Sequence, residues 1–334
     1  MQVKVSELLT DVRSALERRA VPPAEAEVGA RLCVDAELRG HSSHGVRLLR
    51  NVTAEYAAGA DRRGELRVMT ETPVSAQVDG GFHLSWYVHD HAVAIAETKA
   101  RAAGIGMVSV RNAGVSGALG YLVERAAAQG LVCLALNSTP VMVVAPGTTV
   151  PSLGTNPLAV GVPRRGLPPL VLDMSTAGIA FNQVMRLRGL GSELPAGVAL
   201  DSTGTGTIDP AQAIDAESGR ARILPFGGHR GYGLALMVEL LAAAGVSGRT
   251  AATKRGPVVL EPADFSAVYI AYQPGLLGDP EMTAASVEQL LADLSEQDAR
   301  IPGEVSRLRR EQCLQDGVVD IDPEADAILR ALLN

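Results

Sequence analysis

Several ionisable and hydrogen-bonding side chains stand together in the segment Arg39-Gly-His-Ser-Ser-His-Gly-Val-Arg47. His44 can exchange a proton near neutral pH, Ser43 can hydrogen-bond a substrate oxygen, and an arginine can bind a carboxylate through two N–H groups. These residue types predict an acid/base site for a substrate that carries a carboxylate. The same groups can also cap helix ends at a polar corner, so the residues alone leave both interpretations open.

Two apolar helical patterns, at residues 24–38 and 46–56, flank this segment and must position it. Their spacing predicts a corner between two helices, in which Gly45 gives the backbone freedom. Asp173 ends an apolar strand pattern and is the best candidate to orient the His44 ring. A solvated aspartate at a strand end is the alternative.

The remaining pattern alternates between helix and strand, which predicts a mixed α/β architecture. Residues 186–220 are rich in Gly and Thr and show little periodicity, so they form either a functional loop or lid, or a solvated surface excursion. We expect helices at 6–20, 24–38, 90–103, 121–129, 234–244, 283–294 and in a final stretch up to Leu333, and strands at 66–78, 105–110, 131–136, 158–162 and 169–174.

Composition excludes several classes of protein. The 334 residues carry a formal net charge of -7, which gives no electrostatic footprint for nucleic acid or an anionic membrane. The first residues lack an apolar signal core, and no run approaches the roughly 18 apolar residues of a membrane span, so we expect a cytoplasmic protein. Cys33, Cys133 and Cys313 are far apart, odd in number and in apolar surroundings, which indicates buried thiols rather than disulfides or a zinc site.

Common nucleotide and metal motifs are missing. No segment has the Rossmann fingerprint between a strand and a helix, and the Walker phosphate loop is absent. His89 and His91 lie on different faces of a helix, which favours a surface helix start over a metal site, and we expect no metal. The segment from Gly40 to Gly45 lacks the spacing of a nucleophile elbow, so a Ser/His hydrolase is only a minor hypothesis.

An ordered set of motifs resembles the type-2 malate/L-lactate dehydrogenase family over essentially the whole chain. The motifs are Leu38-Arg-Gly-x-x-Ser-His-Gly-Val46, Gly104-Ile-Gly-x-Val-x-Val-Arg-Asn112, Leu153-Gly-Thr-Asn-Pro157, Leu172-Asp-Met-x-Thr176, Leu194-Pro, Asp209-Pro210, Gly227-Gly-x-Arg-Gly-Tyr-Gly-Leu234 and Pro302-Gly-Glu304. Relatives in this family include ureidoglycolate, sulfolactate and diketogulonate reductases and cyclic imino-acid reductases.

The resemblance implies an α/β fold that is not a Rossmann fold. A helical layer from both chain termini would comprise residues 1–75 with 280–334 and serve dimerisation and substrate binding. Residues 76–279 would form a largely antiparallel sheet domain that binds NAD or NADP and carries the chemistry. It also implies a homodimer that acts on a small carboxylate. From the net charge, we expect neither nucleic acid nor a membrane as a partner.

The resemblance further implies roles for individual residues. His44 would be the acid/base, Asp173 would orient it, and Ser43 would contact the substrate. Arg47, Arg50 and Thr139 are the candidates for substrate binding. The candidates for the cofactor site are Asn137, Ser138, Gly154, Thr155, Asn156, Pro157, His229, Arg230 and Gly231.

The chain departs from the family pattern at three places. Leu48 stands where an arginine commonly binds the substrate carboxylate, Val115 where a histidine is usual, and Arg230 where a lysine is usual. The leading hypothesis is reduction of a 2-oxo acid by NADH or NADPH, or oxidation of the matching 2-hydroxy acid. The alternatives are a cyclic imino-acid (ketimine) reductase and a cofactor-binding homologue without redox activity.

Overall fold

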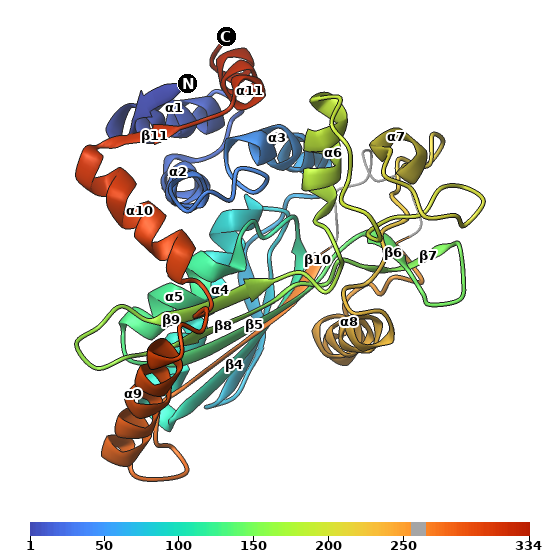
Figure 1. Cartoon of the computed structure of the whole chain (residues 1–334). Coiled ribbons are helices and arrows are strands. Elements are labelled where there is room, and N and C mark those ends of the chain that lie inside the picture. Colours follow the sequence, from blue (N-terminus) through green and yellow to red (C-terminus); the bar gives the residue numbers. More distant parts are fainter. Residues whose placement is uncertain (255–264) are drawn as a thin grey trace.

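A seven-stranded mixed sheet lies at the centre of the computed structural model, which describes residues 1–254 and 265–334 (Figure 1). The strand order is β2-β3-β4-β10-β5-β8-β9; β3 and β4 run parallel and the other neighbouring pairs are antiparallel. The predicted α/β, non-Rossmann fold class is therefore confirmed. The strands are β2 (Arg67–Glu71), β3 (Ser75–Asp79), β4 (Ile105–Ala113), β10 (Phe265–Tyr272), β5 (Val132–Ser138), β8 (Leu158–Val162) and β9 (Leu170–Met174).

Helices cover both faces of this sheet because its central strands are apolar on both sides. On β5, Cys133 and Ala135 pack into the main core with α4 and α5, whereas Leu134 and Leu136 pack on the opposite face against α8. Figure 1 accordingly shows α8 across the sheet from α4 and α5. These helices are α4 (Ser85–Ala103), α5 (Leu119–Ala128) and α8 (His229–Ala242).

The two chain ends form a helical layer together (Figure 1). Strand β1 pairs with β11 through Val3 and Val319, and Arg310 on α10 donates to Asp35 on α2 at 2.6 Å. Helix α9 instead makes an ion pair from Glu288 to Arg164 beside the β8–β9 turn. The layer comprises β1 (Gln2–Lys4), α1 (Val5–Glu17), α2 (Pro23–Leu38), η1 (Val46–Leu48), α3 (Leu49–Ala58), η2 (Ala60–Arg62), α10 (Glu304–Asp316), β11 (Val318–Asp320) and α11 (Pro323–Leu333), with α9 (Pro280–Glu296) apart from it.

The division of the chain at residues 75 and 280 stays a prediction, and residues 255–264 of the expected inner region lie outside the described residues. The expected single final helix, in contrast, was wrong. Helix α10 ends because Gly317 adopts a left-handed conformation with φ of +71°. After β11 the chain starts a new helix, where Asp322 accepts a hydrogen bond from Ala325 N and Pro323 fits the first helical position.

Residues 186–220 are more ordered than their sequence predicted. Helix α6 extends into them, α7 forms within them, and Ala199 joins Val184 and Ile223 in a small second core. Neither these helices nor any other helix in the described ranges is long and apolar enough to cross a membrane. The remaining elements are β6 (Val141–Val144), β7 (Pro151–Gly154), α6 (Phe181–Gly189), α7 (Pro210–Ala213) and η3 (Ala244–Val246).

Candidate active site

The predicted corner lies between α2 and α3, and Glu37 shapes it. Glu37 Oε1 accepts a hydrogen bond from Val46 N at 2.8 Å, and a Cβ on Gly45 would lie only 2.2 Å from the same oxygen. Position 45 therefore needs glycine for the close approach of a carboxylate, while the left-handed residue of the corner is Gly40, with φ of +79°. Burial raises the pKa of Glu37 to about 7.

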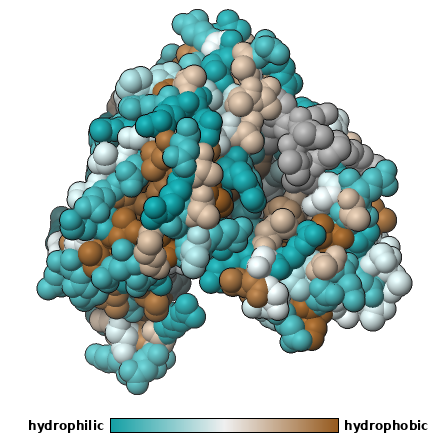
Figure 2. Space-filling model, turned by 90° about the horizontal axis from the view of Figure 1, so that it is seen from above, coloured by the Kyte–Doolittle hydropathy of each residue, from teal (hydrophilic) through white to brown (hydrophobic). Residues whose placement is uncertain are grey.

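A cavity of about 790 Å³ opens beside this corner. Figure 2, which views the molecule from above, shows the surface hollowed near its middle with hydrophilic residues beside the hollow. The volume is within the range of small-molecule and cofactor sites. The predicted residues in its wall are Ser43, His44 and Asp173 of the catalytic set, Arg47, Arg50 and Thr139 of the substrate set, and Thr155 and Pro157 of the cofactor set.

The His44 ring is held by its neighbour. Ser43 Oγ and His44 Nδ1 are hydrogen-bonded at 2.9 Å, and within residues 1–254 and 265–334 Nε2 has no hydrogen bond. Burial, together with the nearby His41, lowers the pKa of His44 to about 4, so the ring is neutral at pH 7. In the tautomer whose Nδ1–H donates to Ser43 Oγ, the neutral ring can accept a proton at Nε2.

Asp173 at the end of β9 lines the same cavity and accepts a hydrogen bond from Gly120 N at 2.7 Å. Burial raises its pKa to about 6, against the opposing effects of Gly120 N and the Arg39 charge. No hydrogen bond joins Asp173 to His44 in the described part of the chain. The structure brings the two groups to one cavity, and the orienting role of Asp173 stays a prediction.

The arginines of the corner have different surroundings. Arg39 is buried in ion pairs with Asp35 and Glu124. Arg47 pairs with Asp322 at 2.7 Å and Glu324 at 2.5 Å, and its side chain is only 9% exposed.

Arg50, one helical turn after Arg47, is exposed to the cavity without an ion pair among the described residues. Arg188 on α6 lines the same cavity and likewise has no ion pair among the described residues. Asp322 and Glu324 therefore occupy Arg47, whereas Arg50 and Arg188 are available to an anion.

The predicted cofactor residues fall into two groups. Thr155 and Pro157 line the cavity together with Thr139, and the hydroxyls of Thr139 and Thr155 are 3.1 Å apart. Gly154 lies directly behind them, where a Cβ would come within 2.4 Å of Thr139 and Asn156 atoms. Close packing of this loop sets two hydroxyl groups into the wall.

Asn137, Ser138 and Asn156 form the second group, with side chains buried behind the wall. Ser138 Oγ and Asn156 Nδ2 both donate to Glu239 Oε2, at 2.8 and 2.9 Å. Asn137 Nδ2 donates to Ser116 Oγ at 2.6 Å, while its Oδ1 is buried without a partner among the described residues. Their assignment to the cofactor stays a prediction, because their side chains bond to the protein itself.

His229, Arg230 and Gly231 form the first turn of α8, and the first two are exposed. Gly231 is required because a Cβ there would lie 2.1 Å from Phe226 O. The preceding turn is tied to the cavity wall, since Phe226 N donates to Thr176 O and Thr176 N to Thr155 O. These hydrogen bonds connect the start of α8 to the cavity wall, while the N–H groups of Arg230, Gly231 and Tyr232 donate to carbonyls of the preceding turn.

Glu55 and Arg188 line the cavity, and neither was predicted from the sequence as a site residue. Glu55 belongs to a helix whose periodicity indicates only a polar face, and Arg188 falls in the region expected to lack structure. A charged residue one turn inside a predicted helix at a functional corner is a signal, although a weak one.

The expected surface position of His89 was wrong. The side chain is fully buried, Tyr269 Oη bonds to its Nδ1 at 2.8 Å, and its Nε2 bonds to Gly114 O at 3.2 Å. Burial lowers its pKa to about 4, so the neutral ring supports the loop after β4. Within the ranges that the structure describes, no group of three or more His, Cys, Asp or Glu side chains is arranged to hold a metal ion.

Comparisons with known proteins cover nearly the whole chain. The family model described as malate/L-lactate dehydrogenase matches residues 3–329. An L-sulfolactate dehydrogenase of Methanocaldococcus jannaschii is 31% identical, over 98% of this chain and 94% of that protein. A (2R)-3-sulfolactate dehydrogenase (NADP(+)) of Chromohalobacter salexigens is 36% identical, over 72% and 71%. The crystal structure of Δ1-piperideine-2-carboxylate reductase from Pseudomonas syringae superposes with a TM-score of 0.86 at 29% identity, covering 99% of both chains.

Proposed function

The chain belongs to the malate/L-lactate dehydrogenase family, and from this premise we propose that it uses NADH or NADPH to reduce a 2-oxo acid, or oxidises the matching 2-hydroxy acid. The observation that carries the proposal is the placement of His44, Asp173 and the unpaired Arg50 around one cavity. A proton-exchanging ring, a carboxyl group and a carboxylate-binding guanidinium are the groups that this reaction requires.

His44 moves the proton in this scheme. In the oxidation direction the substrate hydroxyl gives its proton to His44 Nε2 as the carbon–oxygen double bond forms, and reduction reverses the transfer. The hydride transfer at the same carbon would be the chemistry supplied by a nicotinamide cofactor held in this cavity. Ser43 fixes the ring through Nδ1, and the Asp173 carboxylate stabilises the imidazolium that results.

Arg50 binds the substrate carboxylate. Arg47 is unsuited to this because Asp322 and Glu324 already occupy its guanidinium. Leu48, which stands where the family commonly has an arginine, is 2% exposed and packs in the core. The carboxylate site is therefore displaced along the corner to Arg50.

The residues present fit a nicotinamide dinucleotide. The Thr139 and Thr155 hydroxyls provide hydrogen-bonding groups in the cavity wall, next to Pro157. The first turn of α8, with the exposed Arg230, offers a positive charge and the positive end of the helix dipole to a phosphate beyond the cavity. We infer that these segments hold the nicotinamide and phosphate portions respectively, and that Asn137, Ser138 and Asn156 support the wall.

A cyclic imino-acid reductase is the second candidate. The similarity to the Pseudomonas syringae piperideine-2-carboxylate reductase favours it, as does Val115 at a position where a histidine is usual. A protonated imine can bring its own proton, so it depends less on a second imidazole.

We also infer a cytoplasmic homodimer. The dimer rests on the family resemblance. The reducing compartment is supported by Cys33, Cys133 and Cys313, all of which are free thiols.

The test is NADH or NADPH consumption with a panel of 2-oxo acids, with and without a second acidic group, and with Δ1-piperideine-2-carboxylate. We expect turnover with a 2-oxo acid. Turnover of the imine alone would replace the leading candidate with the second. Cofactor binding without turnover on any compound would establish a homologue without redox activity.

A further inference from the structure

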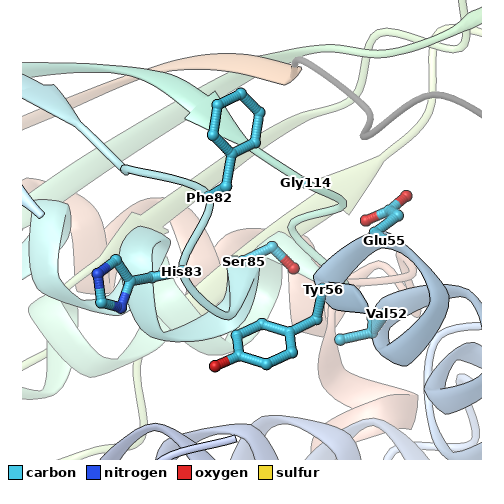
Figure 3. A pocket seen from close by; sticks show the side chains of 7 residues that line it. All are labelled: Val52, Glu55, Tyr56, Phe82, His83, Ser85 and Gly114. Carbon is cyan, nitrogen blue, oxygen red and sulfur yellow. The ribbon is translucent and has the colours of Figure 1, made fainter. Parts of the chain in front are cut away.

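Glu55 on α3 borders two cavities. One is the cavity of about 790 Å³ that contains His44. The other holds only about 10 Å³, close to the least space that a water molecule needs. In Figure 3 the Ser85 hydroxyl projects from the start of α4 toward α3, and the Glu55 carboxyl lies beside the backbone at Gly114. Glu55 is the one residue that lines both spaces in the described part of the chain.

The Glu55 carboxyl is fixed to the loop that follows β4. Its Oε2 accepts a hydrogen bond from Val115 N at 3.1 Å, and a Cβ on Gly114 would lie 2.3 Å from this oxygen. Val115 and Ser116 of this loop line the large cavity, as Glu55 does. Among the described residues Oε1 has no hydrogen bond and remains available to a ligand.

Among the described residues, no cation forms an ion pair with this carboxyl. Around the small cavity, the titratable neighbours are His83, bound to Glu25, and Tyr56, whose hydroxyl bonds to Ala20 O. The ionisable groups that share the large cavity with Glu55 are His41, His44, Arg47, Arg50, Asp173, Arg188 and Glu324. None of these groups perceptibly shifts the pKa of Glu55. Burial raises that pKa to about 7, and the hydrogen bond from Val115 N opposes the rise.

We propose that Glu55 is a specificity-determining residue, which donates a hydrogen bond to an anionic substrate from its protonated carboxyl and excludes that substrate when it is ionised. This proposal rests on the function proposed above. It extends that function because it assigns a second substrate contact in the cavity to an acidic residue, in addition to the basic Arg50. It also links substrate binding to the uptake of a proton.

The pH dependence follows from the sign of the charges. Below about pH 7 the carboxyl carries a proton and can donate to an oxygen of the substrate. Above it the carboxylate repels a second anion in the same cavity. The KM for a 2-oxo acid should therefore rise by about tenfold per pH unit above the pKa of Glu55, with kcat less affected.

The experiment compares wild type and Glu55→Gln in steady-state kinetics between pH 6 and 9. Glutamine keeps an N–H donor and removes the titration, so its KM should vary by less than about threefold over this range. Glu17→Gln, an exposed change on α1, is the matched control and should follow wild type. If Glu55→Gln does not fold, Glu55→Met removes the charge at similar volume and should show a flat, higher KM.

Binding provides a readout that needs no turnover. Trp86, the single tryptophan, is buried next to Gly117 of the same loop, so its fluorescence can report substrate binding. A fluorescence Kd that rises with pH in wild type but not in the variant supports the proposal, even if no compound is reduced. A wild-type KM or Kd that is flat in pH, or a Glu55→Gln profile that follows wild type, would overturn it.

Discussion

The corner from Arg39 to Arg50 and the hydrogen-bonded network around Glu239 are both parts of the predicted site, yet the structure uses them differently. The corner presents Ser43, His44 and Arg50 to the cavity. In the network, Ser138 and Asn156 direct their polar atoms to Glu239, which is only 3% exposed. The motif residues thus divide into those that line the cavity and those that are buried behind its wall.

The difference lies in where each side chain finds its partners. In the corner, Ser43 and His44 bond to each other and Arg50 has no ion pair among the described residues, so these side chains line the cavity with polar atoms that the protein leaves unused. Ser138 instead meets both Glu239 and Lys254, which approach it from α8 and the segment after it. Most buried polar groups are paired. Ser138 and Asn156 find their partners within the protein, so we interpret their network as structural.

The largest expected effect is that of His44→Gln. We expect kcat to fall by about 10²–10⁴-fold, because general acid/base catalysis contributes this much, while the Kd of the cofactor stays nearly unchanged. Single-turnover measurements of nicotinamide oxidation isolate the step. His91→Gln, on α4 and outside the cavity wall, is the control and should keep wild-type kcat. Normal turnover in His44→Gln would remove the corner from the chemistry.

Much of the corner could be predicted from the sequence. The spacing of apolar residues gave both helices, and the density of polar types marked Ser43 and His44. Which arginine is held in an ion pair could not be predicted, because Asp322 and Glu324 lie 275 and 277 residues beyond Arg47. Local periodicity contains no information on such a distant ion pair.

Arg50→Gln and Arg47→Gln should affect different quantities, the first substrate binding and the second stability. Losing Arg50 should raise the KM for the 2-oxo acid by about 10- to 100-fold, the value of a charge-assisted hydrogen bond, with little change in unfolding free energy. Losing Arg47 should reduce the unfolding free energy by about 2 kcal/mol, less than for a fully buried pair because Glu324 is 43% exposed. Kinetics and urea unfolding of both variants measure the contrast. If Arg47→Gln changes KM alone, the assignment of the carboxylate site is reversed.

The surroundings of Glu55 and His89 could not be predicted from the sequence for a different reason. Both belong to helices whose polar positions look solvated in a periodicity pattern. Tertiary packing instead places His89 under the loop after β4, and Glu55 on the other side of the same loop. The order within residues 186–220 was missed similarly, since its small core draws Met142 and Val143 from another part of the chain.

The smallest expected effect is that of Ser138→Ala, which tests whether the network around Glu239 stabilises the fold or binds the cofactor. Its hydroxyl is buried, donates to Glu239 and accepts from Lys254, so its loss should cost about 1 kcal/mol of unfolding free energy. The cofactor Kd should change by less than about twofold, because Ser138 does not line the cavity. Thr155→Val, in the wall, should do the reverse and weaken cofactor binding without a comparable loss of stability. A Ser138→Ala variant of normal stability but weakened cofactor affinity would move Ser138 from the supporting network into the binding site.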